Sequence, residues 1–306
     1  MKTHKGLQCV QGLAGKVVAL IMACAMAQPI LAAPLVVRDD AGEVVTLSQP
    51  AQRVVTLAPH AAELVAAAGG LPVLIGVSQG SDFPPAVREL PRLASYHGPD
   101  LEALLSARPD LIVAWGSGLS DEMHERLATL GMSVFVSEPR TLGDVLTNIA
   151  RLGALLGTQD IADKRVAALQ TRIDQLESEA HVQGIAPLPV FFQLGESPTT
   201  TLGGNHLVNE LIRRCGGEPL LTDSPAVVPQ ITREALWLAS PQLILHPVAQ
   251  GQARRDWVAA WRADAGPLSR VALAGLNPDL ISRPGPRSVE AMAEVCAAIA
   301  KVQAAQ

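Results

Sequence analysis

Three aromatic side chains and two histidines stand where predicted strands give way to loops. Phe83, Tyr96 and Trp115 belong to a chain in which only 3% of residues are aromatic, and His60 and His97 lie near them in sequence. Flat aromatic faces suit a large, partly apolar ligand, although such residues also cover the core beneath them. Loop histidines can bind metal but are more often solvated or hydrogen-bonded. We therefore expect a ligand-contacting surface and no metal site.

No set of residues has the spacing of a catalytic centre. The segment Gly195-Glu-Ser-Pro198 departs from the G-x-S-x-G pattern of hydrolase nucleophiles. Neither a P-loop nor a G-x-G-x-x-G motif follows a predicted strand, and the cysteines lack the spacing of zinc or iron–sulfur ligands. The sequence predicts a binding protein with no catalytic residues and no cofactor. An exported hydrolase is the alternative from another class.

The first 32 residues differ from the rest of the chain. Three lysines precede an apolar run at 17–27, and Pro29 and small residues follow it. This order is typical of a secretory signal peptide, because a membrane-spanning helix needs about 20 apolar residues. We expect cleavage near Ala32, with Ala27 as the alternative position. The segment that ends at Cys24 loosely resembles a lipoprotein box, so lipid attachment there is the alternative.

Size and charge indicate a globular protein of two domains. The chain has 306 residues, of which 48% are hydrophobic and 17% charged, and its net charge of −5 argues against a nucleic-acid partner. Cys215 and Cys296 are the cysteines that remain after signal removal. In an oxidising compartment they can pair, or they can remain as two buried thiols.

Two segments of the chain repeat in the same order. Residues 63–70 match 210–217 and both end in Gly-Gly, while residues 102–115 match 234–247 around a shared proline. The repeat predicts one αβ unit used twice, and hence two similar lobes.

Each unit reads as alternating strands and helices. We predict a strand at 53–57, a helix at 61–68, a helix at 101–107 capped by Asp100, and a strand at 111–115. The last of these is a continuous apolar run, which favours a parallel sheet covered on both faces. The alternation predicts α/β lobes.

A proline-free stretch lies between the two units. Apolar residues recur at helical spacing from 142 to 180, and Gly157 divides them into two helices. The second helix either connects the lobes or covers the surface of the first. The predicted divisions are a signal peptide at 1–32, an N-terminal segment at 33–52, an N-terminal α/β lobe at 53–157, a linking helix at 158–184 and a C-terminal α/β lobe at 185–306.

Several of these segments carry a family resemblance over roughly residues 50–300. They include Ser81-Asp-Phe-Pro-Pro85, Pro109-Asp-Leu-Ile-Val-Ala-Trp115, Phe192-Gln-Leu-Gly195 and Pro229-Gln-Ile-Thr-Arg-Glu234. The chain resembles the periplasmic vitamin B12-binding proteins of bacterial ABC importers, within a helical-backbone family that also binds metals, haem and iron–siderophores. The resemblance implies the class III fold of periplasmic binding proteins: two Rossmann-like lobes with central, mainly parallel sheets, joined by one long backbone helix.

The same resemblance implies a transported ligand, cobalamin or a close corrinoid, held between the lobes. The implied contact residues are Pro59, His60, Phe83, Tyr96, His97, Trp115, Gly195, Val228, Asp279 and Arg283. Asp279 and Arg283 match a polar pair that contacts the amide side chains of the corrin. Val228 departs from the family, which has a tryptophan there. Haem held by Tyr96 or His97 is the alternative ligand, and an iron–siderophore is another.

The resemblance also implies a membrane partner. Glu102 and Glu234 match the glutamates that dock each lobe on the ABC permease, which works with ATPase subunits. These two residues are also aligned by the internal repeat. The family disulfide falls on Cys215 and Cys296. A monomer in the periplasm is expected.

Overall fold

The computed structural model describes residues 33–180, 186–263 and 266–306. Residues 35–306 form one compact unit. The predicted signal peptide and the possible lipid-attachment site at Cys24 lie outside the described residues. Among the helices that are described, none has the length and apolar character needed to cross a membrane.

The first lobe is built on a six-stranded sheet with the strand order β6-β5-β4-β3-β7-β8. Neighbouring strands run parallel except for β5 and β6, which form an antiparallel pair. Because the sheet is covered on both faces, the central strands are almost wholly apolar. The strands are β3 (Val54–Thr56), β4 (Leu74–Ser78), β5 (Arg92–Ser95), β6 (Gly98–Pro99), β7 (Leu111–Trp115) and β8 (Val134–Ser137).

Two helices of the first lobe show the capping signals read from the sequence, whereas α2 begins two residues before the predicted start at 61. Asp100 caps its helix by accepting a hydrogen bond from the N–H of Ala103, and Gly157 ends another in the left-handed region at φ 67°. The helices are α2 (Pro59–Ala67), α3 (Leu101–Ala107), α4 (Asp121–Thr129) and α5 (Leu142–Leu156), with 3₁₀ turns at Leu71–Val73, Pro85–Glu89 and Gly116–Gly118. An antiparallel hairpin, β1 (Leu35–Arg38) and β2 (Val44–Leu47), packs on α5.

The second lobe has a parallel four-stranded sheet with the order β12-β9-β13-β14. Its strands are β9 (Leu188–Phe192), β12 (Gly217–Pro219), β13 (Leu243–Pro247) and β14 (Ala272–Leu276), and a small hairpin consists of β10 (Gly195–Glu196) and β11 (Thr199–Thr200). The helices are α7 (Leu207–Arg214), α8 (Arg233–Ala239), α9 (Gln252–Arg262), α10 (Pro278–Ile281) and α11 (Ser288–Gln303), with a 3₁₀ turn at Pro267–Arg270.

Strand β9 ends at Phe192. The next residue, Gln193, is buried, and its side-chain oxygen accepts hydrogen bonds from the indole N–H groups of Trp257 (2.8 Å) and Trp261 (2.9 Å). This amide therefore anchors α9 to the end of β9.

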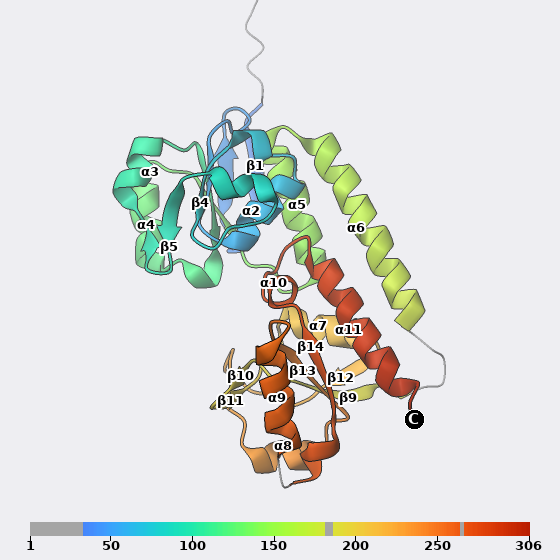
Figure 1. Ribbon diagram of the computed structural model, residues 1–306. Coiled ribbons are helices and arrows are strands. Elements are labelled where there is room, and N and C mark those ends of the chain that lie inside the picture. Colours follow the sequence, from blue (N-terminus) through green and yellow to red (C-terminus); the bar gives the residue numbers. More distant parts are fainter. Residues whose placement is uncertain (1–32, 181–185, 264–265) are drawn as a thin grey trace, which may run out of the picture. The chain divides into compact units, whose positions relative to one another are not determined.

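Helix α6 (Gln159–Ala180) follows the first lobe and leads to the second, as Figure 1 shows. It packs against α5 of the first lobe and α11 of the second. Near its end, Glu177 forms an ion pair with Arg214 of α7 at 3.1 Å. The long backbone helix expected from the sequence is therefore present as α6.

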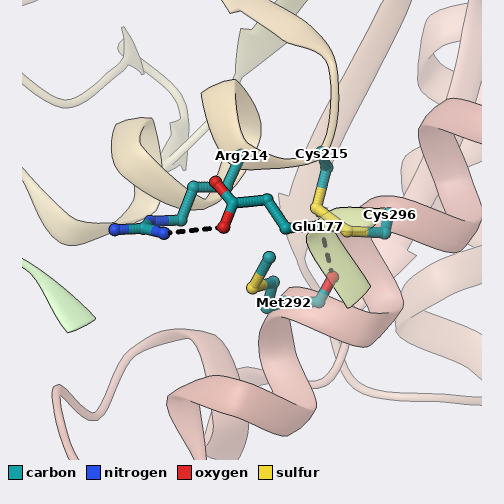
Figure 2. Close-up of a disulfide and its surroundings, with 5 residues drawn as sticks. All are labelled: Glu177, Arg214, Cys215, Met292 and Cys296. Atoms are coloured by element: carbon teal, nitrogen blue, oxygen red, sulfur yellow. Dashed lines mark hydrogen bonds and ion pairs between the residues drawn. A yellow bond between two sulfur atoms is a disulfide. The ribbon is translucent and has the colours of Figure 1, made fainter. Parts of the chain in front are cut away.

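Cys215 and Cys296 form a disulfide that joins the end of α7 to α11 (Figure 2). The Cys215 sulfur lies 3.4 Å from the carbonyl oxygen of Met292. The disulfide implied by the family resemblance is confirmed, and it closes a long loop of the second lobe.

The internal repeat corresponds to equivalent local structures. Helices α3 and α8 each have seven residues, and each has a capped start. They end in left-handed residues, Arg108 at φ 46° and Ser240 at φ 50°, and each leads into a five-residue strand, β7 or β13. One αβ unit is therefore used in both lobes.

Candidate ligand-binding site

A cavity of about 460 Å³ lies at the carboxyl ends of strands from both sheets. Trp115 ends β7, Glu138 follows β8, and Phe192 ends β9; all three line the cavity. In parallel α/β sheets, ligands bind at carboxyl ends, near the point where the strand order reverses. The chain builds β4 and β5 on one side of β3 and then returns to build β7 and β8 on the other. The cavity therefore lies where this fold is expected to bind a ligand.

The cavity wall is mainly apolar with a few polar groups. Trp115, Phe192 and Ile281 contribute apolar surface, and Leu194, Leu202 and Pro225 extend it. The polar side chains that line it are Ser117, Glu138, Arg140, Asn205, His206, Ser224 and Ser282. Such a wall suits a largely apolar ligand that carries hydrogen-bonding groups at its edge.

The three predicted aromatic residues are all partly exposed, but they do not line one cavity. Trp115, 41% exposed, lines the cavity at the strand ends. Phe83, 39% exposed, lines a second cavity of about 320 Å³ and lies beneath the guanidinium of Arg287 at 4.3 Å. Tyr96, 86% exposed, stands between β5 and β6 beside the exposed His97.

His60 was expected in a loop but lies in the first turn of α2, after Pro59 at the start of that helix. It is buried, and its ring meets the edge of Trp115 with 6.0 Å between ring centroids. Burial lowers the pKa of His60 to about 4, although a hydrogen bond to the backbone of Ser137 opposes this shift. His60 therefore supports Trp115 as a neutral ring.

Arg283 is bound to carboxylates of both lobes. It pairs with Asp279 of its own lobe at 2.9 Å and with Asp82 of the first lobe at 2.5 Å. It also reaches Glu63 at 3.4 Å. The hydrogen bond from Arg283 lowers the pKa of Asp82, although partial burial opposes the shift. The Asp279–Arg283 pair is therefore part of a network that joins the lobes.

Glu63 is the buried centre of this network. Only 1% of its side chain is exposed, and Arg287 donates to both of its oxygens, at 2.6 and 2.9 Å. A buried carboxylate needs such partners, because an unpaired charge away from water is costly.

Gly195 and Val228 lie near the first cavity without lining it. A Cβ at Gly195 would lie 2.6 Å from the hydroxyl of Thr200, so the β10–β11 hairpin requires glycine there. Val228 is 46% exposed, and its neighbour Val227 lines the cavity. Among the predicted contact residues, Trp115 is the one that lines this cavity.

Glu102 and Glu234 occupy equivalent places on the two lobes. Both are exposed, and each is the second residue of its helix, α3 or α8. Exposed apolar residues stand one turn on, Leu105 after the first glutamate and Trp237 after the second.

Several cavity residues were missed from the sequence, among them residues 224–227 and the two groups described next. Glu138 and Arg140 follow β8, whose short Val-Phe-Val-Ser run could have been recognised as a strand. The segment 202–206 comes from the loop before α7, and nothing in its sequence indicates a place at the cavity. In the described part of the chain, no three or more His, Cys, Asp or Glu side chains are grouped to hold a metal ion.

The fold and this cavity define a class III periplasmic binding protein. A sequence model of the family described as "Periplasmic binding protein" matches residues 54–250. The chain belongs to this family.

Curated relatives carry the name "Vitamin B12-binding protein". One from Vibrio cholerae is 33% identical over 250 residues, which cover 81% of this chain and 88% of the relative. One from Pectobacterium atrosepticum is 34% identical over 257 residues, which cover 83% and 90%.

Solved structures give the same picture of the fold. The periplasmic vitamin B12-binding protein of Vibrio cholerae superposes with a TM-score of 0.74 at 31% identity, covering 83% of this chain and 98% of that one. A periplasmic heme-binding protein of Pseudomonas aeruginosa superposes with a TM-score of 0.67 at 25% identity, covering 81% and 92%. The fold is thus shared by proteins named for two kinds of tetrapyrrole.

Proposed function

We propose that this protein is the substrate-binding component of an ABC importer and that it captures cobalamin, or a close corrinoid, between its lobes. The observation that carries the proposal is the mainly apolar cavity at strand ends of both sheets, in a chain about one third identical to relatives named for vitamin B12. The protein binds and delivers its ligand without making or breaking bonds. It needs no cofactor of its own.

A corrinoid is larger than the first cavity, so part of it would extend beyond the described wall. We assign the apolar wall to the cavity residues around Trp115 and Phe192. The outer contacts in this proposal come from the remaining predicted residues, which are Pro59, Phe83, Tyr96, His97, Gly195, Val228, Asp279 and Arg283. His60 acts behind Trp115.

The loaded protein would dock on the permease through Glu102 and Glu234. The equivalent, exposed positions of these glutamates on α3 and α8 support this role. Charge pairs of this kind guide orientation and speed association more than they add affinity. ATP hydrolysis by the partner ATPase subunits would then drive release of the ligand.

The proposal divides the chain as the sequence predicts: signal peptide 1–32, N-terminal segment 33–52, lobes 53–157 and 185–306, and linking helix 158–184. The mature protein is a periplasmic monomer, with lipid attachment at Cys24 as the alternative. The mass of the protein purified from an exporting host tests this point. A mature chain that begins near residue 33 supports a free periplasmic protein, whereas an acylated chain beginning at Cys24 would support the anchored form.

Titration of the purified protein with cyanocobalamin and with hemin tests the ligand. We expect one equivalent of cyanocobalamin to bind, measured by calorimetry, and no Soret shift with hemin. A hemin complex whose spectrum changes in Tyr96→Phe, without cyanocobalamin binding, would overturn the proposal. The exposure of Tyr96 is what makes haem the alternative worth testing.

A further inference from the structure

Two polar side chains face the first cavity from opposite lobes. Glu138 follows β8 of the first lobe, and His206 precedes α7 of the second. The charge of Glu138 acts on the His206 ring, so the two groups lie within electrostatic reach of each other.

Glu138 is held in place by its neighbours. The backbone N–H and the hydroxyl of Ser117 donate to its two carboxylate oxygens, at 2.6 and 2.9 Å. The backbone N–H of Glu138 donates to Asp40 at 2.7 Å, and Asp40 is itself paired with Arg151 at 2.9 Å. Each carboxylate oxygen can accept a further hydrogen bond. Glu138 therefore presents a fixed acceptor to the cavity.

His206 presents a donor. Its Nδ1 accepts a hydrogen bond from the N–H of Val208 at 3.2 Å, where it caps α7. In a neutral imidazole, an accepting Nδ1 leaves the proton on Nε2. Burial lowers the pKa of His206, although the charge of Glu138 opposes this shift, so the neutral form is favoured. The tautomer that caps the helix offers an N–H rather than a lone pair for a metal.

We infer that Glu138 and His206 together bind a primary carboxamide at the edge of the ligand, and that they discriminate against a carboxylate at the same place. The amide NH₂ donates to Glu138 and the amide oxygen accepts from His206. This inference rests on the proposed function, because corrinoids carry carboxamide side chains whereas haem carries carboxylates. The subsite would therefore select between the two tetrapyrroles.

A carboxylate in this subsite would meet Glu138 at close range and could not donate to it. Specificity of this kind comes from repulsion and unpaired groups as much as from attraction. Arg140 lines the same cavity, but it is exposed, whereas Glu138 is half-buried. Water screens the attraction that Arg140 would exert on a carboxylate more than it screens the repulsion from Glu138.

The test compares cyanocobalamin with its separated monocarboxylates, in each of which one peripheral carboxamide is hydrolysed. Calorimetry gives the ratio of dissociation constants, acid over amide, for each isomer. For at least one isomer, we expect a ratio of about 10 or more in the wild type, and a ratio at least about threefold smaller in Glu138→Gln. Glu122→Gln, an exposed change on α4, is the matched control and should keep the wild-type ratio.

His206→Asn separates ligand binding from helix capping, since asparagine also caps helices but does not place an N–H at Nε2. We expect weaker cyanocobalamin binding, by about fivefold or more, with an unchanged thermal midpoint. Equal acid-to-amide ratios in the wild type and Glu138→Gln for every isomer would overturn the inference alone. If the wild type bound no cyanocobalamin, the proposed function would fail, and this inference with it.

Discussion

At the scale of single residues, His60 was predicted to contact the ligand, but it is buried and packs against Trp115 instead. His60 follows a strand end, yet its ring is buried in an edge contact with Trp115, and its Nε2 has no hydrogen-bond partner within the described residues. The sequence places a residue at a strand end but does not say whether the next turn is helical. Here Pro59 starts α2 immediately, so His60 turns inward.

The buried state of His60 predicts how stability depends on pH. Because burial lowers its pKa from 6.5 to about 4, the unfolded chain takes up this proton more readily than the folded one. The neutral His60 ring contributes its full share of the unfolding free energy above pH 6.5. As the pH falls toward 4, this share is lost, and the unfolding free energy decreases by on the order of 3 kcal/mol. We expect His60→Asn to lose less unfolding free energy between pH 7 and 4.5 than the wild type, as measured by urea unfolding.

The matched control for this experiment is His97→Asn, which replaces an exposed histidine. It should retain the pH dependence of the wild type. Identical slopes for His60→Asn and the wild type would show that His60 does not titrate as its burial implies.

At the scale of elements, local signals predicted the αβ units of the repeat and the helices between the lobes, and left many other strands and helices unassigned. The helix and strand between 101 and 115 carry a cap, a proline and an apolar run within fifteen residues, and both were placed correctly. Strand β8 has only four residues, and although Gly131 and Pro139 flank it, it was not predicted, and neither was the place of Glu138 behind it. The cavity wall and the Arg283 network depend on contacts between distant segments, which no local pattern encodes.

The disulfide gives a prediction at this scale. Cys215 and Cys296 are 81 residues apart, and the chain-entropy estimate for a loop of this length is about 4.5 kcal/mol of unfolding free energy. We expect the Cys215→Ala, Cys296→Ala double variant to lose about 2–5 kcal/mol in urea unfolding. Affinity for cyanocobalamin should not change, since neither cysteine lines the cavity.

Reduction of the wild type serves as the control, because it breaks the same link without changing a side-chain volume. A double variant as stable as the oxidised wild type would contradict the prediction.

At the scale of the whole described unit, Glu63 and Glu210 join the lobes. These glutamates are the first residues of the matching segments 63–70 and 210–217. Glu63 of α2 binds Arg283 and Arg287 of the second lobe. Its repeat partner, Glu210 of α7, accepts a hydrogen bond from the N–H of Leu142 at 2.7 Å, which begins α5 of the first lobe. Each lobe therefore holds the other through the same position of the repeat, which opposes a wide opening of the cleft.

Removing the charge of Glu63 tests this arrangement. Glu63→Gln leaves Arg287 without its carboxylate partner, whereas Arg283 keeps Asp82 and Asp279. We therefore expect a loss of about 1–3 kcal/mol in unfolding free energy. Urea unfolding measures the loss. Glu290→Gln, an exposed change on the nearby α11, should have little effect. Equal losses in the two variants would show that the network does not stabilise the protein.

The docking role proposed for Glu102 and Glu234 gives the last prediction at this scale. We expect Glu102→Arg combined with Glu234→Arg to abolish cobalamin uptake, because both lobes would then present the wrong charge to the permease. Calorimetry should show unchanged affinity for cyanocobalamin. The double variant Glu122→Arg, Glu290→Arg has the same net charge change and should retain uptake. Normal uptake by the first double variant would refute the docking role.

The equivalence of α3 and α8 raises a question of orientation. A receptor composed of two identical halves would meet a glutamate from either lobe at either of its halves, so charge alone would permit two docked poses related by half a turn. The neighbouring side chains break this degeneracy. Leu105 and Ser106 follow one glutamate, whereas Trp237 and the strongly exposed Leu238 follow the other. A receptor that binds Trp237 and Leu238 at only one of its halves would therefore dock the protein in a single orientation.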